Sequence, residues 1–200
     1  MVLPSSIFLS FLISLVRGGR FSSLANLRFK GLHFLAVAVI IRILLALPPV
    51  QASLIEPALG DLRYGGLAYI VSLLMALLTL LSNIHLPGLR IIALGMAANF
   101  LVIAANLGQM PGALDKLAAA GYTGPSVGHW SNFTVMGENT LLGFLGDNFL
   151  VGRPWPLPSV LSLGDLVIIA GVFWFFQKVM TKPADKTGLK TGPSTPDLSG

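Results

Sequence analysis

Two aspartates that each follow a glycine are the residues best suited to chemistry in this sequence. Asp147 ends the run Leu-Gly-Asp, and Asp165 ends the run Ser-Leu-Gly-Asp that starts at Ser162. Two carboxyl groups that share a proton activate water for peptide hydrolysis, so the pair is a candidate aspartyl dyad. Alternatively, Ser162 and Asp165 fit the capping box that opens a helix. We expect the capping role and no catalytic residue, with the dyad as the alternative.

Arg42 is a charged residue inside the apolar stretch 32–47. A charge near the centre of a membrane-spanning helix costs about 2.5–3.5 kcal/mol on insertion scales. The cost falls when the long side chain reaches the membrane surface or pairs with a carboxylate. Arg42 is therefore expected to have such a structural role, or else to anchor a ligand carboxylate, a lipid phosphate or a partner subunit. The carboxylates expected near it are Glu56, Asp61, Asp147 and Asp165.

Asn99 and Asn106 are amides within the apolar stretch 89–107. Their spacing of two helical turns places both on one face of a helix. Amides in apolar surroundings require hydrogen-bond partners, so this face should point to another helix or to a cavity. Gly95, one turn before Asn99, suits the close approach of a second helix. Interhelical hydrogen bonding is the favoured interpretation, and a polar pathway is the alternative.

Cofactor chemistry finds little support in the residue types. The chain has no cysteine, which excludes disulfides, thiolate nucleophiles and cysteine-ligated metals. His33 and His85 have no histidine or carboxylate three or four residues later, and no nucleotide-binding loop is present. The basic residues lie beside apolar runs rather than among exposed aromatics. We expect no metal, no cofactor and no nucleic-acid partner.

Membrane helices are the elements predicted to position these residues. Hydrophobic residues make up 54% of the 200-residue chain and charged residues 10%, whereas soluble domains carry about 25% charged residues. A helix crosses a bilayer with about 20 apolar residues. The stretches that approach this length are 2–16, 32–47, 64–81, 89–107 and 161–179. The predicted fold is an all-α integral membrane bundle of about five transmembrane helices over residues 1–180.

The segment 108–160 is predicted to lie outside the membrane with structure of its own, because it is long for a loop. Its composition predicts a short helix over 112–120, and apolar spacing predicts an amphipathic surface segment over 138–149. Residues 181–200 are rich in Lys, Pro, Gly, Ser and Thr, which predicts a disordered cytoplasmic tail.

The distribution of Lys and Arg predicts the orientation of the chain. With the N-terminus outside, the inner segments hold nine Lys and Arg and the outer segments hold three. The inner segments are 17–30, 82–90 and the residues after 177; the outer ones are 48–63 and 108–160. The positive-inside rule therefore predicts an outer N-terminus and a cytoplasmic C-terminus.

The run PGLRIIALGMAANFLVIAANLGQMP, from Pro87 to Pro111, and the Gly-Asp motifs at Asp147 and Asp165 resemble an uncharacterised family of bacterial multi-pass membrane proteins, a domain of unknown function. The resemblance covers about residues 1–180 and implies a small protein of the bacterial cytoplasmic (inner) membrane. The stretch from Asp165 is also weakly similar to the last helix of lipoprotein signal peptidases, where Asp165 would match a catalytic aspartate. The chain departs from that pattern because no Asp and Arg follow Asn99 or Asn106.

Three functions fit these features. The favoured one is a non-catalytic accessory or scaffold subunit of a larger membrane complex, with the lipid bilayer and other membrane subunits as partners. No complete catalytic set is present, while polar helix faces offer contact surfaces. One alternative is an intramembrane aspartyl hydrolase that uses Asp147 and Asp165. The other is a small-solute or lipid pathway that uses Arg42, Asn99 and Asn106.

Overall fold

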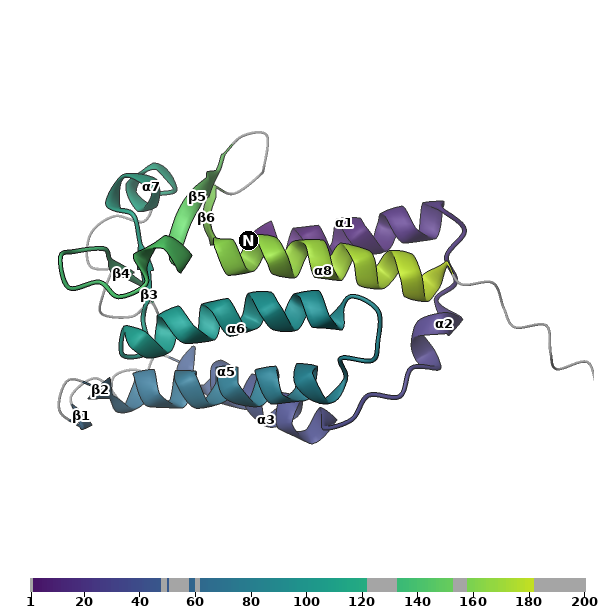
Figure 1. The fold of residues 1–200 in the computed structure, drawn as a ribbon, viewed down its shortest axis with the longest axis horizontal. Coiled ribbons are helices and arrows are strands. Elements are labelled where there is room, and N and C mark those ends of the chain that lie inside the picture. The colour runs from purple at the N-terminus through teal and green to yellow at the C-terminus, as the bar shows by residue number, and fades with distance from the viewer. Residues whose placement is uncertain are drawn as a thin grey trace, which may run out of the picture.

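The computed structural model describes residues 2–47, 50, 58–59, 62–121, 133–152 and 158–181. Long helices lie side by side, and a small sheet gathers at one end of them (Figure 1). The helices are α1 (Val2–Val16), α2 (Ser22–Ala25), α3 (Leu32–Leu45), α5 (Tyr64–Ser82), α6 (Leu89–Ala105), α7 (Leu114–Ala119) and α8 (Leu163–Met180). The predicted tail, 181–200, lies outside the described residues beyond Thr181.

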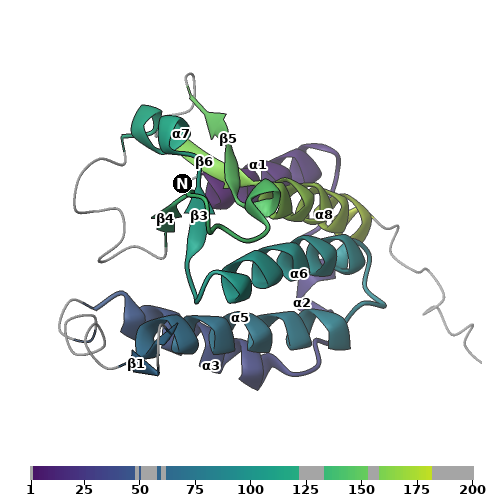
Figure 2. The same ribbon diagram turned by 60° about the vertical axis from the view of Figure 1, so that its left-hand side comes forward.

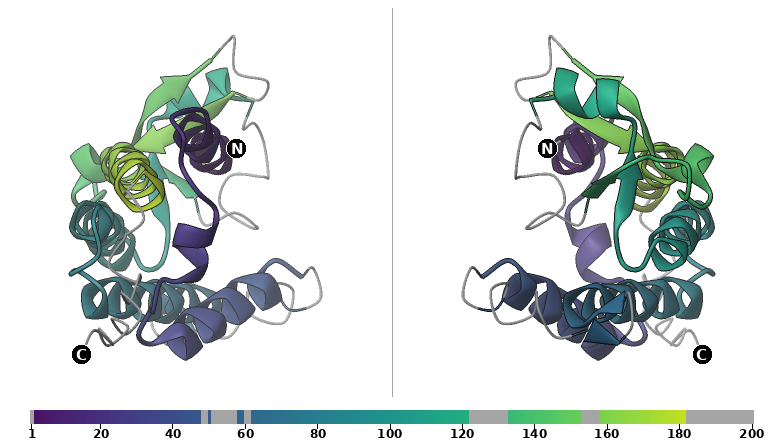
Figure 3. Two further views of the ribbon diagram at one scale, coloured as in Figure 1. Left: turned by 90° about the vertical axis from the view of Figure 1, so that its right-hand side faces the viewer. Right: turned by 90° about the vertical axis from the view of Figure 1, so that its left-hand side faces the viewer.

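The longer helices pack in an order that differs from their order in the chain. Helix α1 packs on α8, α8 on α6, α6 on α5, and α5 on α3. Figure 3, which looks along the helices, shows this series as an arc. Helices α3 and α5 form a layer below α6 and α8 (Figure 2). A hydrogen bond of 2.9 Å from Arg17 Nη1 to Gln177 Oε1 ties the end of α1 to α8.

Helices α6 and α8 approach each other through glycines. A Cβ atom on Gly95 would lie 2.5 Å from the carbonyl oxygen of Gly164. A Cβ atom on Gly88 would lie 2.5 Å from the carbonyl oxygen of Gly171. Backbones this close leave no room for a side chain at either position. The prediction that Gly95 permits close helix approach is confirmed.

A mixed sheet of four strands covers one end of the helices. Its strands are β3 (Met110–Gly112), β4 (Phe133–Val135), β5 (Asp147–Val151) and β6 (Ser159–Ser162), in the spatial order β4-β3-β5-β6. Strand β3 is parallel to β4 and β5, and β5 is antiparallel to β6. A separate antiparallel pair consists of β1 (Ala58–Leu59) and β2 (Leu62–Arg63).

The sheet shows that the predicted all-α fold is wrong. Strands β3 to β5 lie in the segment 108–160, and β6 occupies the first residues of the predicted span 161–179. The 3₁₀ turn η2 (Gly143–Leu145) and β5 replace the amphipathic segment predicted over 138–149, whereas α7 matches the short helix predicted over 112–120. The apolar runs of this segment are too short for stable helices, so their backbone groups pair between strands instead.

Two helices of the described residues, α5 and α8, are long and apolar enough to cross a membrane, so the predicted five-span bundle is also wrong. Helices α1, α3 and α6 have 15, 14 and 17 residues. At about 1.5 Å per residue, these lengths fall short of a hydrocarbon core of about 30 Å. Of the 18-residue apolar stretch in α5, only 28% is buried inside the protein, and for the corresponding stretch in α8 the buried share is 33%. These two largely uncovered helices point to association with a membrane.

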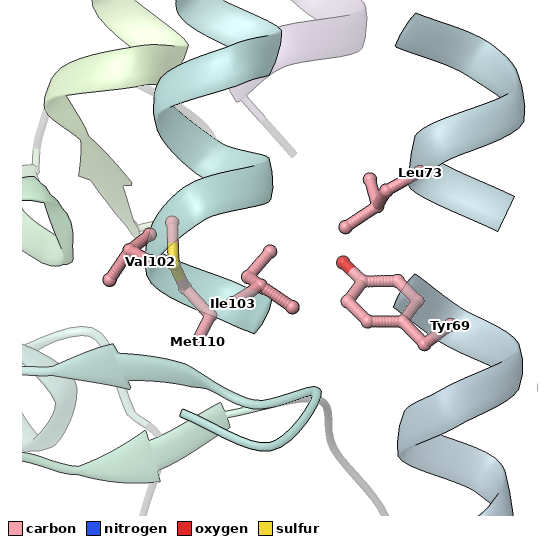
Figure 4. Packing of buried hydrophobic residues seen from close by; sticks show 5 residues of the cluster. All are labelled: Tyr69, Leu73, Val102, Ile103 and Met110. Carbon is pink, nitrogen blue, oxygen red and sulfur yellow. The ribbon is translucent and has the colours of Figure 1, made fainter. Parts of the chain in front are cut away.

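A buried apolar cluster joins the sheet end of α5 to α6. Tyr69 and Leu73 of α5 face Ile103 of α6, and Val102 of α6 and Met110 of β3 complete the cluster (Figure 4). Burial of a large apolar side chain contributes about 1.5–3 kcal/mol to folding. The cluster therefore holds the two helices together beside the candidate site.

Candidate functional site

A cavity of about 400 Å³ lies between α3, α5, α6, α8 and the sheet. Most of its wall is apolar; the polar residues that line it are Arg42, Tyr69, Ser72, Asn99, Asp147 and Asp165. The fold thus brings together four candidates that stand far apart in the sequence, namely Arg42, Asn99, Asp147 and Asp165. The cavity is the candidate functional site.

Asp165 is held in the cavity wall by a closed set of hydrogen bonds. Asn99 Nδ2 donates to Asp165 Oδ1 at 2.8 Å, and the backbone N–H of Ser162 donates to Asp165 Oδ2 at 3.2 Å. Ser162 Oγ donates to Asn99 Oδ1 at 2.8 Å and accepts the backbone N–H of Asp165 at 2.9 Å. The predicted capping box is confirmed. The predicted interhelical bonding of Asn99 is also present, and it fixes the direction of the Asp165 carboxylate.

Asp147 has a different environment at the start of β5. Its backbone is paired on both sides, with Gly112 of β3 and with Ser162 of β6. The residue is 2% exposed, and its carboxyl group accepts no hydrogen bond from the described part of the chain. Burial, and secondarily the negative charge of Asp165, raise the pKa of Asp147 to about 8. At neutral pH the side chain is therefore mostly protonated.

Arg42 lies in the last turn of α3 and lines the same cavity. Its guanidinium carbon lies 4.5 Å from the centre of the Tyr69 ring, a cation–π contact. No carboxylate among the described residues forms an ion pair with it. Glu56 and Asp61, two of the partners expected for Arg42, lie outside the described residues. Arg42 therefore faces the cavity with an aromatic support and without a counter-charge from the described residues.

Asn106 lies at the end of α6 and does not line the cavity. Its Nδ2 donates to the carbonyl oxygens of Val102 at 2.7 Å and Leu141 at 2.8 Å. Its Oδ1 accepts the backbone N–H of Leu141 at 3.0 Å. The Asn106 side chain thus links the end of α6 to the segment before η2. Its role therefore differs from that of Asn99, which bonds Asp165 in the cavity wall.

Tyr69 and Ser72 line the cavity, although neither is a site residue predicted from the sequence. Both belong to the apolar stretch 64–81, and their spacing of three residues places them on one helix face. Ser72 Oγ donates to the carbonyl oxygen of Tyr69 at 2.7 Å. The signal that could have identified them is this pair of polar groups at helical spacing in an otherwise apolar run.

The chemistry available at the cavity is binding and proton exchange. One carboxylate is oriented by donors, one buried carboxyl group is protonated near neutral pH, and one guanidinium lacks an anion from the described residues. Within those residues, no group of three or more His, Cys, Asp or Glu is arranged to hold a metal ion. His129, one of the three histidines, lies outside the described residues.

These features define a class: a helical protein with a small mixed sheet, associated with a membrane, with a partly open cavity lined by a few charged groups. Residues 26–177 match the family of unknown function DUF5317, and the chain belongs to that family. The resemblance to an uncharacterised family is thereby confirmed. The weaker similarity to lipoprotein signal peptidases stays a prediction.

A relative from Thermotoga maritima has a similar sequence. It is described as an uncharacterized protein and is 26% identical over 170 residues, which cover 85% of this chain and 88% of the relative. No solved structure matches the chain. These comparisons support the family and leave the function to be argued from the cavity.

Proposed function

We propose that this protein binds a small amphipathic molecule in the cavity between α3, α5, α6 and α8. The observation that carries the proposal is the composition of the cavity wall. Pockets for small molecules have volumes of about 300–1,000 Å³, apolar walls and a few convergent polar groups. The cavity of about 400 Å³ has these properties. A buried carboxyl group with a perturbed pKa is a further feature typical of functional sites.

The protein is proposed to sit in the bacterial cytoplasmic membrane, with α5 and α8 crossing it. Arg17 follows α1, Arg90 lies at the start of α6, and Lys178 lies in the last turn of α8. These three helix ends lie opposite the sheet (Figure 1). The positive-inside rule favours a cytoplasmic position for this basic end and an outer position for the sheet.

Single cysteines test this orientation, because the chain has none of its own. Leu114→Cys places a thiol on α7 beside the sheet, and Ser82→Cys places one at the end of α5. A membrane-impermeant maleimide is expected to label Leu114→Cys on intact cells and Ser82→Cys only after lysis. The reverse pattern would reverse the orientation. Labelling of both on intact cells would show that α5 does not cross the membrane.

Occupancy of the cavity tests the binding function. Ala76 lines the cavity on α5, so Ala76→Phe fills part of the space a ligand needs. Native mass spectrometry of protein released from nanodiscs is expected to detect a bound small molecule on the unaltered chain and none on Ala76→Phe. The matched control is Leu78→Phe on the same helix, where the side chain is 46% exposed and does not line the cavity. Loss of the molecule from both variants, or its absence from the unaltered chain, would contradict the proposal.

A hydrolase is the second candidate, favoured by the presence of two unlike carboxyl groups on one cavity. It requires that Asp147 and Asp165 act together on a bound peptide. Cleavage of membrane peptides should then disappear in both Asp147→Asn and Asp165→Asn while the helical content is retained. Activity that survives in either variant would eliminate the dyad.

The accessory-subunit function stays a prediction, supported by the exposed apolar faces of α1, α3 and α5. Those faces are equally suited to lipid. Copurification from gently solubilised membranes distinguishes the two, since an accessory subunit should elute with stoichiometric partners. A protein that always elutes alone would contradict the subunit function.

A further inference from the structure

An acidic group, Asp147, and a basic group, Arg42, line the cavity, and neither has a bonding partner for its side chain among the described residues. The Asp147 carboxyl group, 2% exposed, accepts no hydrogen bond from the described residues. The Arg42 guanidinium has no ion pair with them and rests on the Tyr69 ring. A buried polar group that lacks a partner destabilises a fold, so a ligand that bonds Asp147 removes a penalty. The Arg42 side chain is exposed, so its donors are accessible to an anion that enters the cavity. The two groups therefore indicate what the cavity's ligand must bring.

We propose that the ligand is a zwitterion, with a protonated amine at Asp147 and Asp165, an anionic group at Arg42, and an apolar body against the cavity wall. This inference rests on the proposed binding function and names its ligand class. Its chemistry is that of an apolar amino acid or of an aminophospholipid headgroup.

The acidic side of the cavity suits an ammonium group. Asp165 uses one lone pair of each oxygen for Asn99 Nδ2 and the Ser162 N–H, so further acceptor positions remain. Once ionised, Asp147 can accept hydrogen bonds from the ammonium group with both carboxylate oxygens. An ammonium group has three donors, which these carboxyl groups can accept. A metal ion is disfavoured because the described residues contain no group of three His, Cys, Asp or Glu arranged to hold one.

Binding of the amine should release a proton from the protein. Asp147 is protonated in the free cavity, and an ammonium group favours the ionised carboxylate. The charged and titratable groups that line the cavity with it are Asp165 on α8, Arg42 on α3 and Tyr69 on α5. The proton leaves the Asp147 carboxyl group for solvent, and the ligand ammonium keeps its own protons. Near neutral pH we expect close to one proton to be released for each ligand molecule that binds.

The basic side of the cavity suits a carboxylate or phosphate. Arginine presents paired donors that match the oxygens of either group. The guanidinium carbon lies 4.5 Å from the centre of the Tyr69 ring, and this cation–π contact favours a position of the group beside the cavity. A lysine at this position would keep the charge and lose the paired donors.

Calorimetric titration of the full chain in phosphatidylcholine nanodiscs tests the ligand class. The amino-acid arm compares leucine with leucinamide, which lacks the anion, and with 4-methylpentanoate, which lacks the amine. The lipid arm compares short-chain phosphatidylethanolamine with short-chain phosphatidylglycerol, which has no amine. In one arm the zwitterion is expected to bind at least about tenfold more tightly than its single-charge analogues. The arm in which this preference appears shows whether the ligand is an amino acid or a lipid headgroup.

Variants assign the two ends of the ligand. Arg42→Gln and Asp147→Asn are each expected to weaken zwitterion binding by about tenfold or more, whereas Arg90→Gln, outside the cavity, leaves it unchanged. Titrations in buffers of different ionisation enthalpy should show proton release by the unaltered chain and none by Asp147→Asn. Equal affinity for a single-charge analogue, or no response in either arm, would overturn the zwitterion. If native mass spectrometry still detects a bound molecule in that case, the binding function survives and only its ligand class fails.

Discussion

Replacing Gly95 with leucine is expected to force helices α6 and α8 apart and to destabilise the protein more than any exposed substitution. A Cβ atom at this position would lie 2.5 Å from the carbonyl oxygen of Gly164 and 2.9 Å from the backbone nitrogen of Ile168. Backbone atoms cannot move aside as a flexible side chain can. Overpacking of a well-packed site costs about 1–3 kcal/mol, and we expect the upper end of that range or more.

The same substitution should also break the cavity wall. Asn99 lies one turn after Gly95 and bonds Asp165 across the two helices. Thermal unfolding in detergent should show a lower midpoint for Gly95→Leu. Gly137→Leu is the matched control, because a Cβ atom there would meet nothing within 4 Å. Equal midpoints for the two variants would show that the helices do not touch at Gly95.

Replacing Asp147 with asparagine is expected to remove a pH dependence from the stability of the protein. The pKa of Asp147 is raised from the ordinary value of 3.8 to about 8, so between these values the folded chain holds a proton that the unfolded chain has lost. The stabilisation is therefore complete below the unfolded value and is lost as the pH rises towards 8. The slope is about 1.4 kcal/mol per pH unit for one fully linked proton.

Unfolding midpoints of ligand-free protein at about pH 5 and about pH 9 measure this linkage. The unaltered chain should be distinctly less stable at the higher pH, and Asp147→Asn should show a much smaller difference. The control is Asp115→Asn on α7, whose exposed carboxylate pairs with Lys116 and lies away from the cavity. An unchanged pH dependence in Asp147→Asn would show that its carboxyl group is not buried and protonated.

Local features of the fold could be predicted from neighbouring residues. The capping box follows from the spacing of Ser162 and Asp165, and the close helix contact follows from Gly95 in an apolar helix. The apolar stretches predicted as spans all form helices, with ends close to those predicted. These features depend on chain neighbours within one or two helical turns, which a sequence displays directly.

The sheet and the cavity could not be predicted in the same way. Strand β3 holds only Met110 to Gly112, and its partners begin at Phe133 and Asp147. Runs this short carry too few residues for a period of two to stand out. The predicted bundle also takes apolar content as sufficient for a full span, whereas α3 has only 14 residues. Composition indicates a membrane environment, but helix length decides which helices cross it.

The order in which the helices and the sheet pack brings Arg42, Asp147 and Asp165 to one cavity. The predicted bundle places Asp147 and Arg42 towards the same outer side, which makes Asp147 one of the expected partners of Arg42. In the structure, the sheet positions Asp147 at the cavity through its pairing with Gly112 and Ser162. Their proximity is therefore a property of the tertiary structure that no local pattern contains.

An experimental structure in lipid nanodiscs tests the central claim, that this cavity is a ligand site in a membrane-associated protein. We expect lipid density around α5 and α8, and density for a bound molecule that contacts both Asp147 and Arg42. A cavity filled by the protein's own side chains, with Asp147 paired directly to Arg42, would contradict the claim.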